Sequence, residues 1–313
     1  MKKTLLIGAG AIGSATAFAL IFSGVAHKVV LVDINTAKAE AEATDIAHAA
    51  PFASAGKIKA GTYTDIAQSD IVIITAGANQ KPGETRIDLL ERNVQIFKQI
   101  IPQVVQNAPD CLMIVATNPA DVMTEVALKL SGFEAHRVFG SGTVLDTARF
   151  RSLLAYFLGV SSKSVHANVL GEHGDSEVLI WSSARVGSLS VEDFAAAVHK
   201  NLDTAKKAEI SDNVVNAAYK IIAGKGFTAY GIAGALTQIC RAIANNDYSV
   251  LNISSHHPEI EGISNVCLSL PTIVNRRGAY QVIMPKLSAQ EHDSLRQSAE
   301  KMQTYTAHAL KML

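Results

Sequence analysis

The sequence predicts an α/β protein, in which an N-terminal doubly wound parallel sheet precedes a C-terminal mixed α+β domain. Up to residue 140, short and continuously apolar runs alternate with longer amphipathic segments, a pattern typical of parallel strands buried between helices. A glycine-rich turn at residues 8–13 separates the first apolar run from the first helical segment. Beyond it, long helical segments with scattered strand-like runs predict a different architecture. We therefore expect domains at residues 1–140 and 141–313.

The expected elements follow this pattern in order. In the first half, strands are expected at residues 4–7, 29–32, 71–75 and 111–116, and helices at 12–23, 36–48, 86–100 and 122–130. In the second half, helices are expected at 145–158, 191–224 and 229–245, and strand-like runs at 167–170, 267–270 and 278–283. Ser288 and Glu291 are spaced as a capping box, which predicts that a final helix begins there.

Composition excludes several classes of partner. The 313 residues contain 28 Lys and Arg against 28 Asp and Glu, and no basic cluster occurs. Nucleic acids and acidic membrane surfaces attract proteins through such a positive field, so neither is expected as a partner. The three cysteines are widely spaced and form no CxxC pair, which favours reduced thiols in a cytoplasmic protein without a metal site.

The uncharged segment 4–26 follows two lysines and has the length of a signal peptide or a membrane span. Three glycines interrupt it, and it divides into a short aliphatic run and an alanine-rich run. A strand followed by a helix explains both features, so we assign the segment to the fold.

The glycine spacing matches the fingerprint of a Rossmann dinucleotide-binding turn. Gly8 permits the tight turn, Gly10 lets the backbone approach a pyrophosphate, and Gly13 lets helix and strand pack closely. The helix N-terminus around Ala11 and Ile12 offers unpaired N–H groups and the positive end of its dipole to the phosphates. The sequence therefore predicts a dinucleotide site at this turn.

Asp33 indicates which dinucleotide is bound. It ends the second expected strand, 20 residues after Gly13. A carboxylate at this place accepts hydrogen bonds from ribose hydroxyls and repels a 2′-phosphate, which predicts NAD rather than NADP. The alternative is an aspartate that only caps the following helix.

Two further strand ends carry small and polar residues. Thr75, Gly77 and Ala78 follow one strand, and Asn118 follows another. Ligands bind at the carboxyl edge of such sheets, so these residues are candidates to line the cofactor site. Asn118 is a candidate to hold the nicotinamide ribose or a substrate oxygen, or else is a turn residue before proline.

Reduction of a ketone by hydride needs a proton donor, a polarised carbonyl and a means of binding the rest of the substrate. His173 follows an apolar run and lies between glycines, and histidine exchanges protons near neutral pH. Asp146 and Arg149 are three residues apart on one helix face. Asp146 would raise the pKa of His173, and Arg149 would bind a carboxylate through two hydrogen bonds. A loop histidine without a role and a surface ion pair are the alternatives.

Residues 77–86 are polar, contain Gly77 and Gly83, and end at Arg86. A closing lid would exclude water and bring a cation to the carbonyl. An ordinary solvated loop fits the composition equally well.

Taken together, these segments resemble the L-lactate dehydrogenase family, a branch of the lactate/malate dehydrogenase superfamily, over essentially the whole chain. The most specific stretches are ITAGANQKPGETR at 74–86, ATNPA at 116–120, SGTVLDTARFR at 141–151 and GEHGDS at 171–176. The resemblance implies an NAD-dependent cytoplasmic oxidoreductase that interconverts pyruvate and (S)-lactate. It also implies a homotetramer.

The resemblance assigns roles to the matching positions. His173 matches the proton donor and acceptor, and Asp146 matches its carboxylate partner. Arg149 matches the arginine that binds the substrate carboxylate, and Arg86 matches the lid arginine that polarises the carbonyl. Three further residues match positions near the substrate or the nicotinamide: Asn118, Ser141 and Thr228.

Gln80 separates the branches of the superfamily. In similar malate dehydrogenases the matching lid residue is an arginine that pairs with the second carboxylate of oxaloacetate. Closing a neutral lid over oxaloacetate would bury an unpaired charge at a cost of roughly 3–5 kcal/mol, so the resemblance favours pyruvate. Dehydrogenases of longer L-2-hydroxy acids, such as hydroxyisocaproate, also lack this arginine and are the alternative. A non-catalytic NAD-sensing protein is disfavoured, because His173, Asp146, Arg149 and Arg86 are all present.

Arg151 and His166 match positions that line a subunit interface in bacterial relatives and bind fructose 1,6-bisphosphate there. Vertebrate-type enzymes carry the same pair without this activation, so the resemblance leaves allosteric regulation open.

Overall fold

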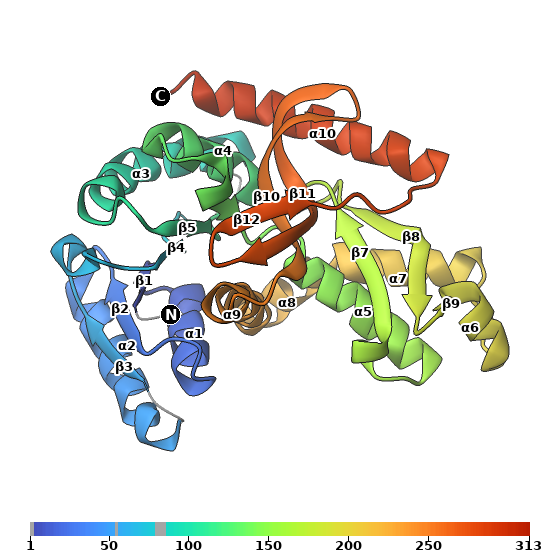
Figure 1. Ribbon diagram of the computed structural model, residues 1–313, viewed down its shortest axis with the longest axis horizontal. Helices are drawn as coiled ribbons and strands as arrows, with labels where there is room; N and C mark the ends of the chain where they lie inside the picture. Colours follow the sequence, from blue (N-terminus) through green and yellow to red (C-terminus); the bar gives the residue numbers. More distant parts are fainter. Residues whose placement is uncertain (1–2, 54–55, 79–85) are drawn as a thin grey trace.

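The computed structural model describes residues 3–53, 56–78 and 86–313 (Figure 1). Within them, one sheet crosses the centre of the molecule in the order β12-β11-β10-β6-β5-β4-β1-β2-β3. Its strands from β1 to β6 pair in parallel, and β10 to β12 extend it by antiparallel pairing. The order β6-β5-β4-β1-β2-β3 is that of a doubly wound nucleotide-binding sheet, so the predicted fold class is confirmed.

The first half alternates strands and helices as expected. Its strands are short and mostly apolar, and β1, β4 and β5 are buried along their whole length. The elements are β1 (Thr4–Ile7), α1 (Ala11–Phe22), β2 (Lys28–Val32), α2 (Thr36–Ala49), β3 (Lys57–Ala60), β4 (Ile71–Ile74), α3 (Arg86–Asn107), β5 (Leu112–Val115), α4 (Ala120–Ser131) and β6 (Val138–Gly140), with 3-10 turns at Ala50–Phe52, Tyr63–Ile66 and Ala135–Arg137.

The second half adds a small antiparallel sheet, β7-β8-β9, and packs it against α5. A long C-terminal helix, α10, lies across β11 and α4 at the top of Figure 1. The elements are α5 (Val144–Leu158), a 3-10 turn at Ser162–Ser164, β7 (Val165–Leu170), β8 (Val178–Val186), β9 (Leu189–Ser190), α6 (Val191–Ala197), α7 (Thr204–Val215), α8 (Ala217–Lys225), α9 (Tyr230–Asn245), β10 (Ser249–Ile260), β11 (Ile263–Asn275), β12 (Gly278–Val282) and α10 (Ala289–Leu310).

The prediction of a single helix at residues 191–224 was wrong. Three helices, α6, α7 and α8, occupy this segment. Just after the end of α6, His199 has a positive φ of 56°, which no helix continues through. Asp203 then caps α7 by accepting a hydrogen bond from the Lys206 N–H. By contrast, α3 continues beyond residue 100 and past Pro102, because Ile101 and Val104 belong to the apolar core.

Strand β10 was not expected. Because β10 joins the antiparallel strands to β6, the continuation of the parallel sheet into the second half of the chain was also missed. Four of the six buried positions of β10 hold polar residues, Asn252, Ser254, Ser255 and His257, which breaks the apolar pattern of a core strand. These polar groups find hydrogen-bond partners inside the protein. The boundary between residues 140 and 141 stays a prediction, since one sheet takes strands from both sides of it.

Three connections bring elements that are distant in sequence together where the catalytic residues are expected. Strand β6 passes through Ser141 into α5, and Gly171, at the end of β7, forms a bridge with Ser269 of β11. Helix α4 contacts β6, β10 and β11. Among the described residues, no helix combines the length and apolarity needed to cross a membrane.

Candidate active site

The glycine turn between β1 and α1 is fixed by close packing at two of its three glycines. Gly8 has φ of 114°, and a Cβ there would lie 2.6 Å from the Ala76 nitrogen. A Cβ on Gly13 would lie 1.8 Å from the Gly8 carbonyl oxygen. A Cβ on Gly10 would have no atom within 4 Å, so no neighbour in the described chain requires this glycine. The space beside it suits the approach of a pyrophosphate to the backbone.

Asp33 holds the same turn from the end of β2. Its Oδ2 accepts a hydrogen bond from the Ala9 N–H at 2.6 Å, and its Oδ1 accepts one from the Asn35 N–H at 2.8 Å. Asn35 itself caps α2, through the Lys38 N–H, so the alternative role of Asp33 as that cap is wrong. Each carboxylate oxygen keeps a lone pair for a ribose hydroxyl.

A polar network ties together the strand ends beside the turn. The Thr75 hydroxyl donates to the Gly8 carbonyl at 3.0 Å, and the Thr117 hydroxyl donates to the Ala76 carbonyl at 2.7 Å. Gly77 leaves room for Thr117, whose methyl group would lie 2.5 Å from a Cβ at this position. The carboxyl edge of the sheet is therefore closely packed where the cofactor is expected.

Asn93 is a residue of this edge that sequence reasoning missed. It is 1% exposed on α3, its Oδ1 accepts from the Ala78 N–H at 2.8 Å, and its Nδ2 donates to the Asn118 carbonyl at 2.7 Å. The side chain of Asn118 is exposed and remains accessible for a ligand. The signal that could have identified Asn93 is its position as a polar residue on the apolar face of an amphipathic helix.

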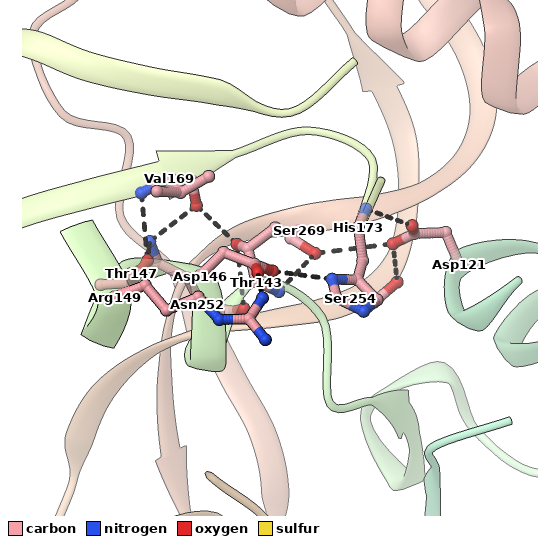
Figure 2. Close-up of polar contacts among 10 residues, drawn as sticks. All are labelled: Asp121, Thr143, Asp146, Thr147, Arg149, Val169, His173, Asn252, Ser254 and Ser269. Carbon is pink, nitrogen blue, oxygen red and sulfur yellow. Dashed lines mark hydrogen bonds and ion pairs between the residues drawn. The ribbon is translucent and has the colours of Figure 1, made fainter. Parts of the chain in front are cut away.

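His173, Asp146 and Arg149 form one cluster (Figure 2). His173 Nδ1 lies 2.7 Å from Asp146 Oδ2, and Arg149 Nη1 donates to Asp146 Oδ1 at 2.7 Å. The side chain of Asp146 is 2% exposed, that of Arg149 16% and that of His173 22%. The i,i+3 pair is thus buried against the histidine, and the alternative of a solvated surface ion pair is wrong.

The charges of this cluster stabilise one another. Burial opposes ionisation of Asp146, but the charges and hydrogen bonds of His173 and Arg149 outweigh it and lower the pKa of the carboxyl. Burial likewise opposes the imidazolium, and Asp146, with smaller contributions from Asp121 and Glu177, raises the pKa of His173 to about 9. His173 therefore carries a proton at neutral pH.

Asp121, at the N-terminus of α4, positions the histidine from the opposite side and was missed from sequence. Its Oδ2 accepts from the His173 N–H at 2.7 Å, and its Oδ1 accepts from the Ser254 hydroxyl at 2.6 Å (Figure 2). Burial raises the pKa of Asp121 to about 6, although the bonds from Ser254 and His173 favour its charged form. A residue of the first half of the chain, Asp121, thus fixes the backbone of His173, which belongs to the second half.

The glycines on both sides of His173 have internal explanations. A Cβ on Gly171, whose φ is 87°, would lie 2.7 Å from the Ser298 hydroxyl of α10, and one on Gly174 would lie 2.9 Å from Glu172 Oε1. Glu172 pairs with Lys301 of α10 at 2.6 Å. Packing against α10 and Glu172 therefore explains both glycines.

The N-terminus of α5 is fixed by buried polar groups. Ser141 is 2% exposed, and its N–H donates to the Val115 carbonyl of β5 at 2.9 Å. The Thr143 hydroxyl donates to the Val169 carbonyl at 2.5 Å, and Asn252 of β10 donates to the Thr147 hydroxyl at 2.9 Å (Figure 2). These bonds set the position from which Asp146 and Arg149 project.

The remaining expected residues lie apart from this cluster or outside the described chain. Gln80 lies outside the described residues, and Arg86 begins α3 with a side chain that is not described. Thr228 lies between α8 and α9, and a Cβ on the nearby Gly231 would lie 2.9 Å from Leu145 Cδ1, next to Asp146. The first turn of α9, which follows Thr228, therefore approaches the start of α5.

Arg151 of α5 lies next to the strand that carries His166, β7. Arg151 donates to the carbonyl of Ala167 at 2.8 Å, and its burial lowers the pKa of the guanidinium. His166 is exposed on β7, and the exposed Arg185 is its cross-strand partner on β8. Three basic side chains thus belong to one small region.

Asp146, His173 and Glu177 form the one group of carboxylates and histidines in the described chain with the spacing of a cation site, all donor atoms lying within 4.8 Å of one another. Asp146 already bonds Arg149 and His173. The positive charge of both partners opposes a metal ion, so we retain the expectation of metal-free chemistry.

Two domains of one known protein family match this chain. The NAD-binding domain of lactate/malate dehydrogenases matches residues 2–140, and the α/β C-terminal domain of the same family matches residues 143–312. The chain belongs to the lactate/malate dehydrogenase family. It is an NAD-dependent oxidoreductase, and the predictions of family, NAD and enzyme class are confirmed.

Individual relatives match over nearly the whole chain. An L-lactate dehydrogenase of Thermus aquaticus is 49% identical over 298 residues, which are 95% of this chain and 96% of that protein. An L-lactate dehydrogenase of Allorhizobium ampelinum is 48% identical and covers 96% of this chain and 97% of its own length. The crystal structure of a lactate dehydrogenase from a Medee basin deep-sea metagenome library is 38% identical, with a TM-score of 0.95 over 98% of both chains.

Proposed function

We propose that this protein is an L-lactate dehydrogenase, which reduces pyruvate with NADH to (S)-lactate and catalyses the reverse reaction. The observation that carries the proposal is the buried cluster in which Asp146 hydrogen-bonds both His173 and Arg149, at 2.7 Å each. A proton donor and a carboxylate-binding cation, held beside an NAD-binding sheet, are the groups that reduction of a 2-keto acid requires. The names of the relatives support the same substrate.

The cofactor site is proposed at the glycine turn. Gly10 lets the pyrophosphate approach, Asp33 accepts hydrogen bonds from the ribose, and Asn118 and Ser141 lie toward the nicotinamide. Thr75, Gly77 and Ala78 line the edge between them. Bound NADH supplies the hydride to the carbonyl carbon.

The chain's own side chains then supply the proton and hold the substrate. Arg149 binds the carboxylate of pyruvate through two hydrogen bonds. Since Nδ1 of His173 bonds Asp146, Nε2 is the ring nitrogen that gives a proton to the carbonyl oxygen, and Asp146 stabilises the imidazolium before transfer. Arg86 is assigned the polarisation of the carbonyl and Thr228 a place beside the substrate, and the neutral Gln80 suits the methyl group of pyruvate.

Steady-state oxidation of NADH tests this function directly. Pyruvate, oxaloacetate and 2-ketoisocaproate are compared side by side, and kcat/KM is expected to be highest for pyruvate. A higher value for 2-ketoisocaproate would make the protein a broad L-2-hydroxy-acid dehydrogenase, the alternative that the lid sequence leaves. A higher value for oxaloacetate would contradict the role of Gln80.

Gln80→Arg tests that role separately. The new cation pairs with the second carboxylate of oxaloacetate, so the ratio of kcat/KM for oxaloacetate over pyruvate is expected to rise by at least about tenfold, a difference of roughly 1.4 kcal/mol in transition-state binding. Gln80→Asn, which adds no charge, is the matched control. An unchanged ratio in the arginine variant refutes the assignment.

We also propose that the protein works as a cytoplasmic homotetramer and that fructose 1,6-bisphosphate activates it. A cavity of about 1170 Å³ lies between α1, α2 and α9, and the exposed Phe18, Phe22 and Tyr230 line it. Burying such aromatic surface against a second subunit is favourable. The bisphosphate is proposed to bind Arg151 and His166, with Arg185 as a neighbouring cation.

A further inference from the structure

Glu177 is a carboxyl group beside the catalytic cluster that the proposed reaction does not use. It lies immediately before β8, and one of its carboxylate oxygens is within 4.8 Å of the donor atoms of Asp146 and His173. Its Oε1 is buried and has no hydrogen-bond partner among the described residues. An unpaired carboxylate oxygen in a buried site is costly, and its position next to a titrating histidine points to a role in that titration.

We propose that Glu177 is a positioning residue that acts with Asp146 to set the pH range over which His173 holds its proton. The inference rests on the proposed function, in which His173 supplies the proton for reduction. Asp146 bonds His173 directly, whereas Glu177 acts through its charge alone, because no hydrogen bond joins it to the imidazole. The two carboxyl groups come from different elements, α5 and the segment that leads into β8.

The charged groups around Glu177 decide when it ionises. Burial and the Asp146 charge raise the pKa of Glu177 to about 8, while the charges of His173 and Arg149 oppose this rise. Glu172 also faces it, but Lys301 of α10 pairs with Glu172 at 2.6 Å. Glu177 is therefore protonated at neutral pH and ionises only as the solution becomes alkaline.

Asp121 of α4 faces His173 from the other side and adds to the same effect (Figure 2). The sign of the Glu177 contribution follows from Coulomb's law. Above about pH 8 its new negative charge favours the imidazolium, so His173 keeps its proton to higher pH than Asp146 and Asp121 alone would allow. Because each group shifts the other, the pair titrates in two joint steps.

The test compares Glu177→Gln with the unmodified enzyme and with Glu209→Gln, an exposed glutamate on α7 that loses the same charge. The pKa of the His173 imidazole is measured by NMR, with the signal assigned from a His173→Asn variant. The pH dependence of kcat/KM for pyruvate is measured in parallel. Glu177→Gln is expected to lower both the His173 pKa and the alkaline limit of pyruvate reduction by roughly 1 pH unit. Glu209→Gln is expected to shift neither quantity.

An unchanged pKa of His173 in Glu177→Gln overturns the inference, even when activity falls, because a merely structural role moves activity without moving the titration. The NMR titration does not depend on turnover, so it decides the role of Glu177 even if pyruvate is not the substrate. Failure of the proposed function would show instead as absent pyruvate reduction by the unmodified enzyme. Glu177→Met, of similar size and uncharged, replaces the glutamine variant if that variant does not fold.

Discussion

Asp146 joins the two side chains that a 2-hydroxy-acid dehydrogenase needs, a proton donor and a carboxylate-binding cation. One of its oxygens bonds His173 and the other accepts from Arg149. The helix spacing of Asp146 and Arg149 could be predicted from sequence because it is local. Asp121 could not be predicted, because its bond to the His173 backbone spans 52 residues and depends on the fold.

The protonation state of His173 determines how activity depends on pH. His173 must be protonated to reduce pyruvate and neutral to oxidise lactate, and its pKa is about 9. The pH profile of kcat/KM is therefore expected to fall through about pH 9 for pyruvate and to rise through the same range for lactate. In Asp146→Asn, which loses the charge that raises this pKa, both transitions move to lower pH. Unmoved transitions in that variant would contradict the pairing.

The charge of Asp33 determines which cofactor the protein prefers. The Asp33 carboxylate repels a 2′-phosphate, so kcat/KM is expected to be much higher with NADH than with NADPH. Asp33→Asn removes the charge but keeps an oxygen for the Ala9 N–H, and its preference for NADH is expected to narrow while the fold is retained. Equal efficiency of the unmodified enzyme with both cofactors is the result that excludes a ribose role for Asp33.

At the scale of elements, the start of α4 links the nucleotide-binding sheet to the catalytic loop and to β10. Asp121→Ala would leave the buried His173 N–H and Ser254 hydroxyl without their acceptor. The expected cost is about 1–3 kcal/mol of unfolding free energy for each donor, with reduced kcat because the histidine loses its backbone anchor. Urea unfolding and pyruvate kinetics measure both effects, and the exposed Asp110→Ala serves as control. Normal kcat in Asp121→Ala would remove this residue from the positioning of His173.

The elements also show why sequence reasoning succeeded in one half and failed in parts of the other. Continuous apolar runs identify β1, β4 and β5, since both faces of the sheet are covered. Strand β10 escapes this pattern because four of its six buried positions hold polar residues, among them Asn252 and Ser254, which bond across the site. The break between α6 and α7 depends on one positive φ and one cap, and α7 and α8 meet at Asn216, the C-cap of one and the N-cap of the other. Periodicity alone reveals neither break.

The whole molecule is expected to assemble into a tetramer and to respond to fructose 1,6-bisphosphate. Light scattering is expected to give four times the 33.2 kDa of one chain. Fructose 1,6-bisphosphate is expected to lower the pyruvate concentration for half-saturation, and His166→Ala to weaken this response, whereas the exposed His27→Ala keeps it. An unchanged half-saturation in the unmodified enzyme would end the proposal of activation without affecting the catalytic site.

The most direct test of the account separates cofactor binding from proton transfer in a single variant. His173→Asn keeps a polar side chain of similar reach but cannot supply the proton, while the glycine turn and Asp33 are untouched. NADH affinity, measured by fluorescence, is expected to be unchanged, and kcat for pyruvate is expected to fall by about 10²–10⁴-fold. Pyruvate reduction at the unmodified rate in this variant would contradict the central claim that the His173 and Asp146 pair carries the reaction.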